Sequence, residues 1–199
     1  YTLCPSTTHF RSCLVSGFSF HMKSPAAYRI VTLANGARSV HSLAHRETFH
    51  PVIGPEAEAE ALYVRQLRLP ERIRSHPAEF VVWDIGLGAA ANALTLLRAV
   101  RPLPYHLRLV SFDQTLEPLA FALDHAEALG YVAGYEGLLR QLWQEHQATL
   151  VTANQHLAWS LCLGDFPSLL AQPAAERWPK PHAILFDPYS PARNPAMWT

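Results

Sequence analysis

Two glycines one residue apart follow a short apolar segment, and this pattern could bind a nucleotide or nucleoside cofactor. The segment ends in Asp84-Ile85-Gly86-Leu87-Gly88 and continues directly into a helix-forming sequence, 89–94. Gly86 and Gly88 carry no side chain, so the backbone can approach a ligand closely there. The free N–H groups at the start of the following helix favour an anionic group. The pattern predicts a cofactor site at the end of the first strand of a doubly wound sheet.

Four aspartates stand at the ends of apolar segments that are typical of strands. They are Asp84, Asp113, Asp165 and Asp187. The segments 80–85, 107–112, 161–163 and 183–186 alternate with helix-forming stretches, which implies parallel pairing. Because the carboxyl ends of parallel strands meet at one edge of a sheet, all four carboxylates are expected there. A single aspartate could instead cap a helix or occupy a turn, but four at one edge favour a functional site.

The spacing of these acids is compatible with NAD or with S-adenosylmethionine. In a dinucleotide fold, an acid about 20 residues past the glycines binds the ribose diol, and Asp113 lies 25 residues after Gly88. The third glycine of the dinucleotide motif is replaced by Ala91, which makes a pyrophosphate cradle less favoured. A sulfonium tolerates an acid-rich site that would repel pyrophosphate, and Asp165 suits the adenine amino group. The pattern therefore favours a methyltransferase.

The stretch 187–199 contains three prolines and two aromatic residues directly after an apolar segment. Its start, Asp187-Pro188-Tyr189, is similar to the Asp/Asn-Pro-Pro-Tyr loops of amine methyltransferases. Methyl transfer is an in-line displacement, so the acceptor nitrogen must direct its lone pair at the sulfonium methyl. A carboxylate and a proline-fixed carbonyl can hold the N–H and leave the lone pair free. A proline-rich structural turn is the alternative.

The remaining elements must position these groups. Asn35-Gly36 separates two β-rich segments, 28–33 and 38–43, and predicts a hairpin. Helices are expected over 56–69, 115–129 and 137–146. The expected fold class is α/β, a Rossmann-like class I methyltransferase fold with a doubly wound, mostly parallel sheet preceded by the N-terminal β-hairpin.

The 199 residues are enough for one domain of generous size or for one domain with an appendage. Residues 1–22 lack the pattern of a signal peptide and are expected to be a disordered extension, with Met22 as the natural start. Residues 23–78 carry the hairpin and a helix, and 79–199 form the cofactor-binding core. Since 183–186 is apolar throughout, that strand is expected to have a neighbour on each side. We therefore expect further C-terminal strands to be missing from this chain, or another chain to close the sheet edge.

Composition limits the partners. Lys and Arg number 16, as do Asp and Glu, so the net charge is zero and nucleic-acid binding by charge alone is excluded. An RNA partner would have to be recognised by a local patch or by shape.

No apolar run approaches the roughly 20 residues that cross a bilayer, so no membrane partner is expected. The three cysteines form neither a metal-spaced nor an even set, which fits a reducing, cytoplasmic compartment. His41, His45 and His50 do not share a helix face, and no metal is expected.

Several segments resemble the tRNA 5-methylaminomethyl-2-thiouridine methyltransferases. Residues 187–199 resemble the family's Asp-Gly-Phe-(Ala/Ser)-Pro-x-x-Asn-Pro-x-(Met/Leu)-Trp loop. Residues 47–58, with Glu-Thr-Phe-His at their start, resemble Glu-Thr-Tyr-His-Ser…Gly-Ala-x-x-Glu, and 84–92 resemble (Glu/Asp)-x-Gly-Phe-Gly-Thr-Gly-x-Asn. Gly164-Asp165 falls where the family also has Gly-Asp. The resemblance covers about residues 28–199 and departs from the family at Ala89-Ala90, in place of Thr-Gly, and at Pro188, in place of Gly.

The resemblance implies S-adenosylmethionine as cofactor and tRNA as partner. It implies that the methionine end is held by Asp84, Gly86 and Gly88, the ribose by Asp113 and the adenine by Asp165, with Glu58 near the cofactor. It further implies that Asp187 is catalytic and orients or deprotonates the exocyclic amine of the modified wobble uridine. Tyr189 would pack on the acceptor base, and Arg193 would contact a phosphate or be a solvated loop residue.

Two other function classes stay open. A methyltransferase for a small-molecule amine is favoured by the zero net charge and by Pro188. A non-catalytic binding module is favoured by the altered glycine motif and by the C-terminal end. Binding of S-adenosylmethionine separates the binding module from the two enzymes, and methylation of undermodified tRNA separates the two enzymes from each other.

Overall fold

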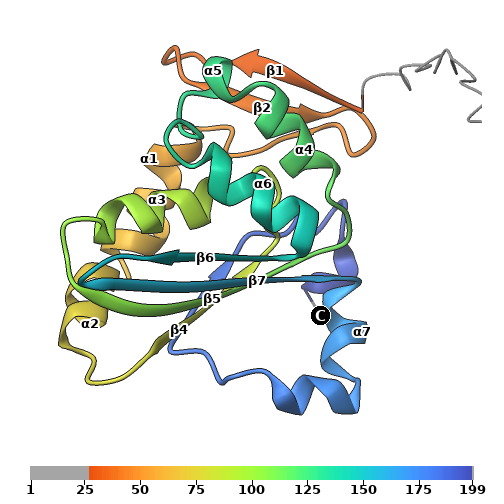
Figure 1. The fold of residues 1–199 in the computed structure, drawn as a ribbon. Helices are drawn as coiled ribbons and strands as arrows, with labels where there is room; N and C mark the ends of the chain where they lie inside the picture. Colours follow the sequence, from red (N-terminus) through yellow and green to blue (C-terminus); the bar gives the residue numbers. More distant parts are fainter. Residues whose placement is uncertain (1–26, 199) are drawn as a thin grey trace, which may run out of the picture.

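The centre of the protein is a five-stranded sheet with helices on both faces (Figure 1). The computed structural model describes residues 27–198, so the expected extension 1–22 lies outside the described residues. Four strands are mutually parallel: β4 (Phe80–Ile85), β5 (Tyr105–Asp113), β7 (Gln155–Leu163) and β8 (Ala183–Phe186). The strand order is β6-β7-β5-β4-β8, and β6 (Gln147–Val151) pairs antiparallel with β7. The α/β fold with a mostly parallel sheet is therefore confirmed.

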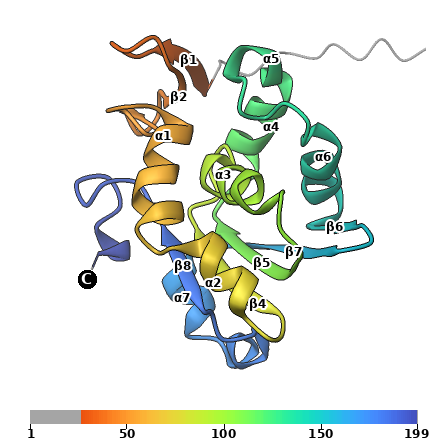
Figure 2. The same ribbon diagram turned by 90° about the vertical axis from the view of Figure 1, so that its left-hand side faces the viewer.

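The two faces of the sheet carry cores of different size. On one face a large core of leucines, alanines and valines packs under the helices between β3 and β6. These helices are α1 (Pro55–Ala59), the π-helix η1 (Glu60–Arg65), α2 (Leu69–Ser75), α3 (Ala91–Val100), α4 (Glu117–Asp124), α5 (Ala126–Leu129) and α6 (Glu136–Glu145). On the other face an aromatic cluster built around Phe112 packs under the segment between β7 and β8. That segment contains α7 (Phe166–Leu170) and the 3-10 helix η2 (Pro173–Arg177), and Figure 2 shows α3 and α7 on opposite sides of the sheet.

The N-terminal hairpin is confirmed. Strands β1 (Tyr28–Thr32) and β2 (Arg38–Ser42) pair antiparallel, and Gly36 takes a φ of +85° in the turn between them. A short third strand, β3 (Glu47–Thr48), pairs with β2 and leads into the loop that carries Phe49 and His50. The small sheet thus delivers residues 45–51 to the carboxyl edge of the large one.

Three details of the predicted elements were wrong. The helix expected over 56–69 is α1 continued as η1, which ends at Arg65. Arg68, with a φ of +51°, separates it from α2, which begins at Leu69. The helix expected over 115–129 is interrupted at His125 and so forms α4 and α5. Strand β6 was missed because it is a short, partly exposed edge strand. Strand β7 is longer than the apolar segment 161–163 indicated and pairs with β5 along its whole length.

Strand β8 lies at the edge of the described sheet and pairs with β4. Its Ile184 side chain is exposed, whereas Leu185 is fully buried. The chain then turns over the carboxyl ends of β4 and β5, through the loop that begins at Asp187 and on to the 3-10 helix η3 (Pro195–Met197).

Candidate active site at the carboxyl edge of the sheet

A cavity of about 660 Å³ opens where β4, β5 and β8 end. This volume is typical of a site for a drug-sized ligand or a cofactor. Its wall combines the ends of the three strands with the loop that follows the small N-terminal sheet. The lining segments are 45–51, 85–89, 112–115 and 187–190, with Tyr28, Glu58, Pro118, Phe166, Arg193, Asn194 and Met197. Segments far apart in the sequence thus form one site at the edge that the aspartate pattern predicted.

The glycine turn forms the floor of this cavity and brings two loops into contact with it. The backbone N–H groups of Gly86 and Leu87 both donate to the Phe112 carbonyl, at 2.9 and 3.2 Å. Gly86 has a φ of +88°, and a Cβ added there would lie 2.5 Å from the Asp187 carbonyl oxygen. A Cβ on Gly88, whose φ is +53°, would lie 3.2 Å from the Phe49 ring. The two glycines therefore leave space for neighbouring protein segments.

Asp113, the last residue of β5, faces this turn. Its Oδ2 accepts a hydrogen bond from the Gly88 N–H at 2.8 Å, and its Oδ1 accepts one from the Thr115 N–H at 3.2 Å. Burial raises the pKa of the Asp113 carboxyl, although the hydrogen bonds from these backbone N–H groups act in the opposite direction. The carboxylate is thus held rigidly on the cavity wall, beside the start of α3.

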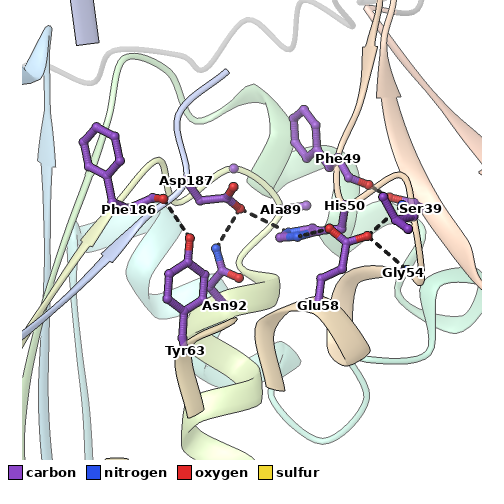
Figure 3. Close-up of polar contacts among 12 residues, drawn as sticks. Ser39, Phe49, His50, Gly54, Glu58, Tyr63, Ala89, Asn92, Phe186 and Asp187 are labelled. Carbon is purple, nitrogen blue, oxygen red and sulfur yellow. Dashed lines mark hydrogen bonds and ion pairs between the residues drawn. The ribbon is translucent and has the colours of Figure 1, made fainter. Parts of the chain in front are cut away.

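Asp187 follows β8 directly and lines the cavity, with its side chain between those of Asn92 and His50 (Figure 3). Its Oδ2 accepts a hydrogen bond from the Asn92 side-chain amide at 2.8 Å and lies 3.4 Å from Nε2 of His50. The preceding carbonyl, that of Phe186, accepts a hydrogen bond from the Tyr63 hydroxyl at 2.7 Å. Burial raises the pKa of the Tyr63 hydroxyl, so this group stays a donor. Helices η1 and α3 therefore fix both the backbone and the side chain at the end of β8.

Two glutamates hold the loops that surround Asp187. Oε1 of Glu58 accepts hydrogen bonds from the N–H groups of Val52 and Ile53, at 2.7 and 2.9 Å. Glu47 accepts hydrogen bonds from both the backbone N–H and the hydroxyl of Ser190. The N-terminal loop and the loop after β8 are thus joined by charged hydrogen bonds, which are stronger than neutral ones.

Similar proteins are known both among sequences and among solved structures. No family model matches the sequence. The chain is 27% identical over 181 residues to the tRNA 5-methylaminomethyl-2-thiouridine biosynthesis bifunctional protein MnmC of Polaromonas naphthalenivorans, covering 85% of this chain and 27% of that protein. It is 29% identical over 156 residues to the protein of the same name from Aeromonas hydrophila, covering 72% of this chain and 23% of that protein.

The crystal structure of MNMC2 from Aquifex aeolicus has the same fold. It matches with a TM-score of 0.60 and 19% identity, covering 89% of this chain and 55% of that one. The resemblance indicated by the motifs is confirmed. The chain spans about a quarter of the length of its MnmC relatives, and its fold agrees with the Aquifex MNMC2 structure.

Two of the four predicted carboxylates do not line the cavity. Asp84 is 1% exposed, because it precedes the last residue of β4 and its side chain lies within the layers of the fold. Its Oδ2 accepts a hydrogen bond from the Ser111 hydroxyl at 2.8 Å, and burial raises its pKa to about 7. The role expected for Asp84 at the methionine end of a cofactor stays a prediction, and the structure shows this side chain behind the cavity lining.

Asp165 also lies outside the cavity lining, because it is the N-cap of α7. It accepts hydrogen bonds from the Ser168 N–H at 3.2 Å and from the Ser168 hydroxyl at 2.6 Å, and these bonds lower its pKa. The capping role that the sequence left as an alternative is the one observed. Phe166, the next residue, does line the cavity.

Tyr189 and Arg193 lie on the cavity wall, where the loop after β8 was expected to meet the acceptor. The Tyr189 ring stacks on His45 with centroids 4.0 Å apart and contacts the Phe49 ring edge-on at 5.7 Å. Burial raises the pKa of the Tyr189 hydroxyl. Arg193 is exposed, and its backbone N–H donates to the Ser190 carbonyl at 2.8 Å.

Sequence reasoning assigned no role to four residues that the structure brings to the site: Glu47, Phe49, His50 and Asn92. All four stand inside the segments that carry the family resemblance, and that position was the available signal. Glu58 was expected near the cofactor and does line the cavity, but its hydrogen bonds go to the loop backbone.

In the part of the chain that the structure describes, no cluster of three or more His, Cys, Asp or Glu side chains could hold a metal ion. No helix between residues 27 and 198 is long and apolar enough to span a bilayer.

Proposed function

We propose that this chain is an S-adenosylmethionine-dependent N-methyltransferase domain that methylates the 5-aminomethyl group of the modified wobble uridine of tRNA. One observation carries the proposal: Asp187 and the glycine turn 86–88 line the same cavity, and the Asp187 backbone packs against Gly86. A site that holds the methyl donor over the turn would therefore present the acceptor to Asp187. The MnmC relatives are named for the biosynthesis of this nucleoside, which supports the choice of acceptor. A cytoplasmic location is part of the same proposal.

The residues around the turn fit such a cofactor. Asp113 is fixed by backbone N–H groups with its carboxylate on the cavity wall, where it can accept hydrogen bonds from a ribose diol. Gly86 and Gly88 would receive the methionine end, and the Phe112 and Phe166 side chains supply apolar wall for the adenine. When bound, the cofactor supplies an electrophilic methyl group on a sulfonium sulfur.

Asp187 would act on the acceptor amine. An alkylamine must have a free lone pair before it can attack, so it must lose a proton or direct its N–H bonds away from the methyl group. The two polar contacts of the Asp187 carboxylate, with Asn92 and His50, are both made by Oδ2, which leaves Oδ1 to accept an N–H from the amine. Held in this way, the nitrogen would direct its lone pair at the methyl group that the cofactor supplies, and the Asp187 carboxylate would take up the proton that the amine releases. Orientation of this kind lowers the barrier by proximity and by electrostatic stabilisation.

The loop after β8 would bind the nucleotide that carries the amine. Tyr189 already takes part in a ring stack, and stacking on aromatic rings is the usual way in which an unpaired base is held. Arg193 and Arg46 both line the cavity and can contact phosphates. Since the net charge is zero, such local contacts would have to provide the attraction for tRNA.

The test is methyl transfer from labelled S-adenosylmethionine to bulk tRNA that carries the 5-aminomethyl group without its final methyl. We expect one methyl group on the modified uridine, detected by nucleoside mass spectrometry. The matched control is tRNA from cells that do not install the aminomethyl group, which should stay unlabelled. Transfer to small amines but not to tRNA would favour the small-molecule alternative. Failure to bind S-adenosylmethionine in a titration would favour the non-catalytic module.

A further inference from the structure

His50 lies between two carboxylates that come from different parts of the fold (Figure 3). Its Nε2 is 3.4 Å from Oδ2 of Asp187, and its Nδ1 is 3.9 Å from Oε2 of Glu58. The His50 side chain is only 9% exposed, and that of Glu58 is 14% exposed, whereas that of Asp187 is 39% exposed. The imidazole is thus enclosed on the Glu58 side and connects that enclosed carboxylate to the open one.

The Glu58 side chain, on the enclosed side of His50, is held rigidly. Its Oε1 is held by the backbone N–H groups of Val52 and Ile53, and more weakly by that of Gly54 at 3.4 Å. This leaves Oε2 as the oxygen that faces His50. A side chain fixed by backbone donors can in turn fix the ring beside it, so Glu58 determines the orientation of the imidazole.

We propose that His50 is a positioning residue that holds the Asp187 carboxylate by Oδ2, so that Oδ1 points to the acceptor amine. The inference rests on the proposed function, because it concerns the residue assigned to the amine. Asn92 donates to the same Oδ2 from the opposite element, α3. The hydrogen bond from Asn92 and the close approach of the imidazole to the same oxygen restrict the rotation of the carboxylate, which is the property that an orienting residue needs.

The ionisable groups around His50 define how this contact depends on its protonation. Glu58 comes from α1 and Asp187 from the loop after β8, and both present carboxylate oxygens. Tyr63 of η1 and the buried Asp84 of β4 are close enough to Asp187 to interact electrostatically with its carboxylate. Only the imidazolium form of histidine donates at both nitrogens, whereas either neutral tautomer leaves one carboxylate without a donor. The contact with Asp187 requires a proton on Nε2, which the imidazolium and one of the two neutral tautomers carry.

Two substitutions separate positioning from simple support of the loop. The amide nitrogen of glutamine can replace Nε2, which faces Asp187, and that of asparagine can replace Nδ1, which faces Glu58. We expect H50N to lose about 10- to 100-fold in kcat, the equivalent of one charge-assisted hydrogen bond. H50Q should stay within about fivefold of the parent, and KM for tRNA and the affinity for S-adenosylmethionine should change little in both.

The backbone at this position makes the comparison sharper. His50 has a φ of +48°, and asparagine accepts this left-handed region better than glutamine does. If His50 only supported the loop, H50N would be the better-folded and more active variant. The positioning role predicts the opposite order. The control is H41N, because His41 contacts Thr48 on the neighbouring strand and does not line the cavity.

A second readout requires no substrate and therefore separates this inference from the proposed function. In protein labelled with ¹³C at aspartate carboxyls, the Asp187 resonance, assigned by its loss in D187N, should move in H50N and stay close to its parental position in H50Q. An Asp187 resonance that is unchanged in H50N, or an H50N enzyme at least as active as H50Q, overturns the positioning role. If the parent protein does not methylate tRNA, the proposed function fails while the resonance still decides whether His50 holds Asp187.

Discussion

The contact between Gly86 and the Asp187 carbonyl gives the most direct prediction from this structure. We expect G86A to be destabilised by about 2–5 kcal/mol. Of this, about 1–2 kcal/mol comes from placing a residue with a Cβ in a left-handed conformation, since the φ is +88°. The remainder, about 1–3 kcal/mol, comes from overpacking, because the new Cβ would lie 2.5 Å from the Asp187 oxygen and 2.9 Å from its carbonyl carbon. These are backbone atoms next to Pro188, so they cannot move as a flexible side chain would.

Another glycine, Gly134, provides a matched control for the cost of the left-handed backbone conformation. Gly134 has a φ of +84°, and a Cβ there would meet no atom within 4 Å. G134A should therefore lower the free energy of unfolding only by the about 1–2 kcal/mol that the left-handed conformation costs. The assay is urea unfolding of both variants, analysed by linear extrapolation. Equal destabilisation of G86A and G134A would falsify the claim that Gly86 is required by the approach of the Asp187 loop.

Three further predictions concern the aspartates. Asp84 holds its proton in the folded protein up to about pH 7, whereas the unfolded chain releases it near 3.8. The free energy of unfolding should therefore fall as pH rises between these values and level off above. D84N should lack this contribution, which urea unfolding across pH would detect, and an unchanged pH dependence would contradict the assignment. D113A should weaken S-adenosylmethionine binding about 10- to 100-fold, measured by titration calorimetry, and an unchanged affinity would place the ribose elsewhere. D187N should lower the rate of tRNA methylation about 10²-fold or more if Asp187 is the base, with cofactor affinity retained. A smaller, pH-independent loss would mean that Asp187 only orients the amine, and a parental rate in D187A would exclude it from the reaction.

The sequence predicted the sheet well because its signals are local. The Asn35-Gly36 turn and the apolar segments before the aspartates depend on neighbouring residues alone, and the structure confirms the elements they indicated. The same local view did not show which of the four carboxylates at this edge line the cavity, and two of them do not. Asp84 was counted as a strand end, but Ile85 is the last residue of β4, and so the Asp84 side chain is buried instead of facing the cavity. Asp165 is separated from β7 by Gly164 and caps α7.

The contacts that build the site could not be predicted because they join distant segments. His50 and Asp187 are 137 residues apart in the sequence. Glu47 and Ser190, which connect the two loops, are 143 residues apart. No periodicity or spacing encodes such a pairing. It depends on how the small N-terminal sheet is placed against the large one, and hence on packing around residues such as Tyr28 and Phe49.

The altered glycine motif carries less weight against catalysis than the sequence alone indicated. Ala90 occupies the position where the resembling family has glycine, and it takes the left-handed conformation with a φ of +63° although it has a Cβ. The Ala89 carbonyl accepts a hydrogen bond from the buried Tyr131 hydroxyl at 3.2 Å, which holds the turn from behind. A left-handed alanine costs about 1–2 kcal/mol, so the surrounding structure must maintain this backbone shape. Because the turn keeps the conformation that a glycine would allow, and the cavity in front of it stays open, the substitution does not by itself favour a non-catalytic module.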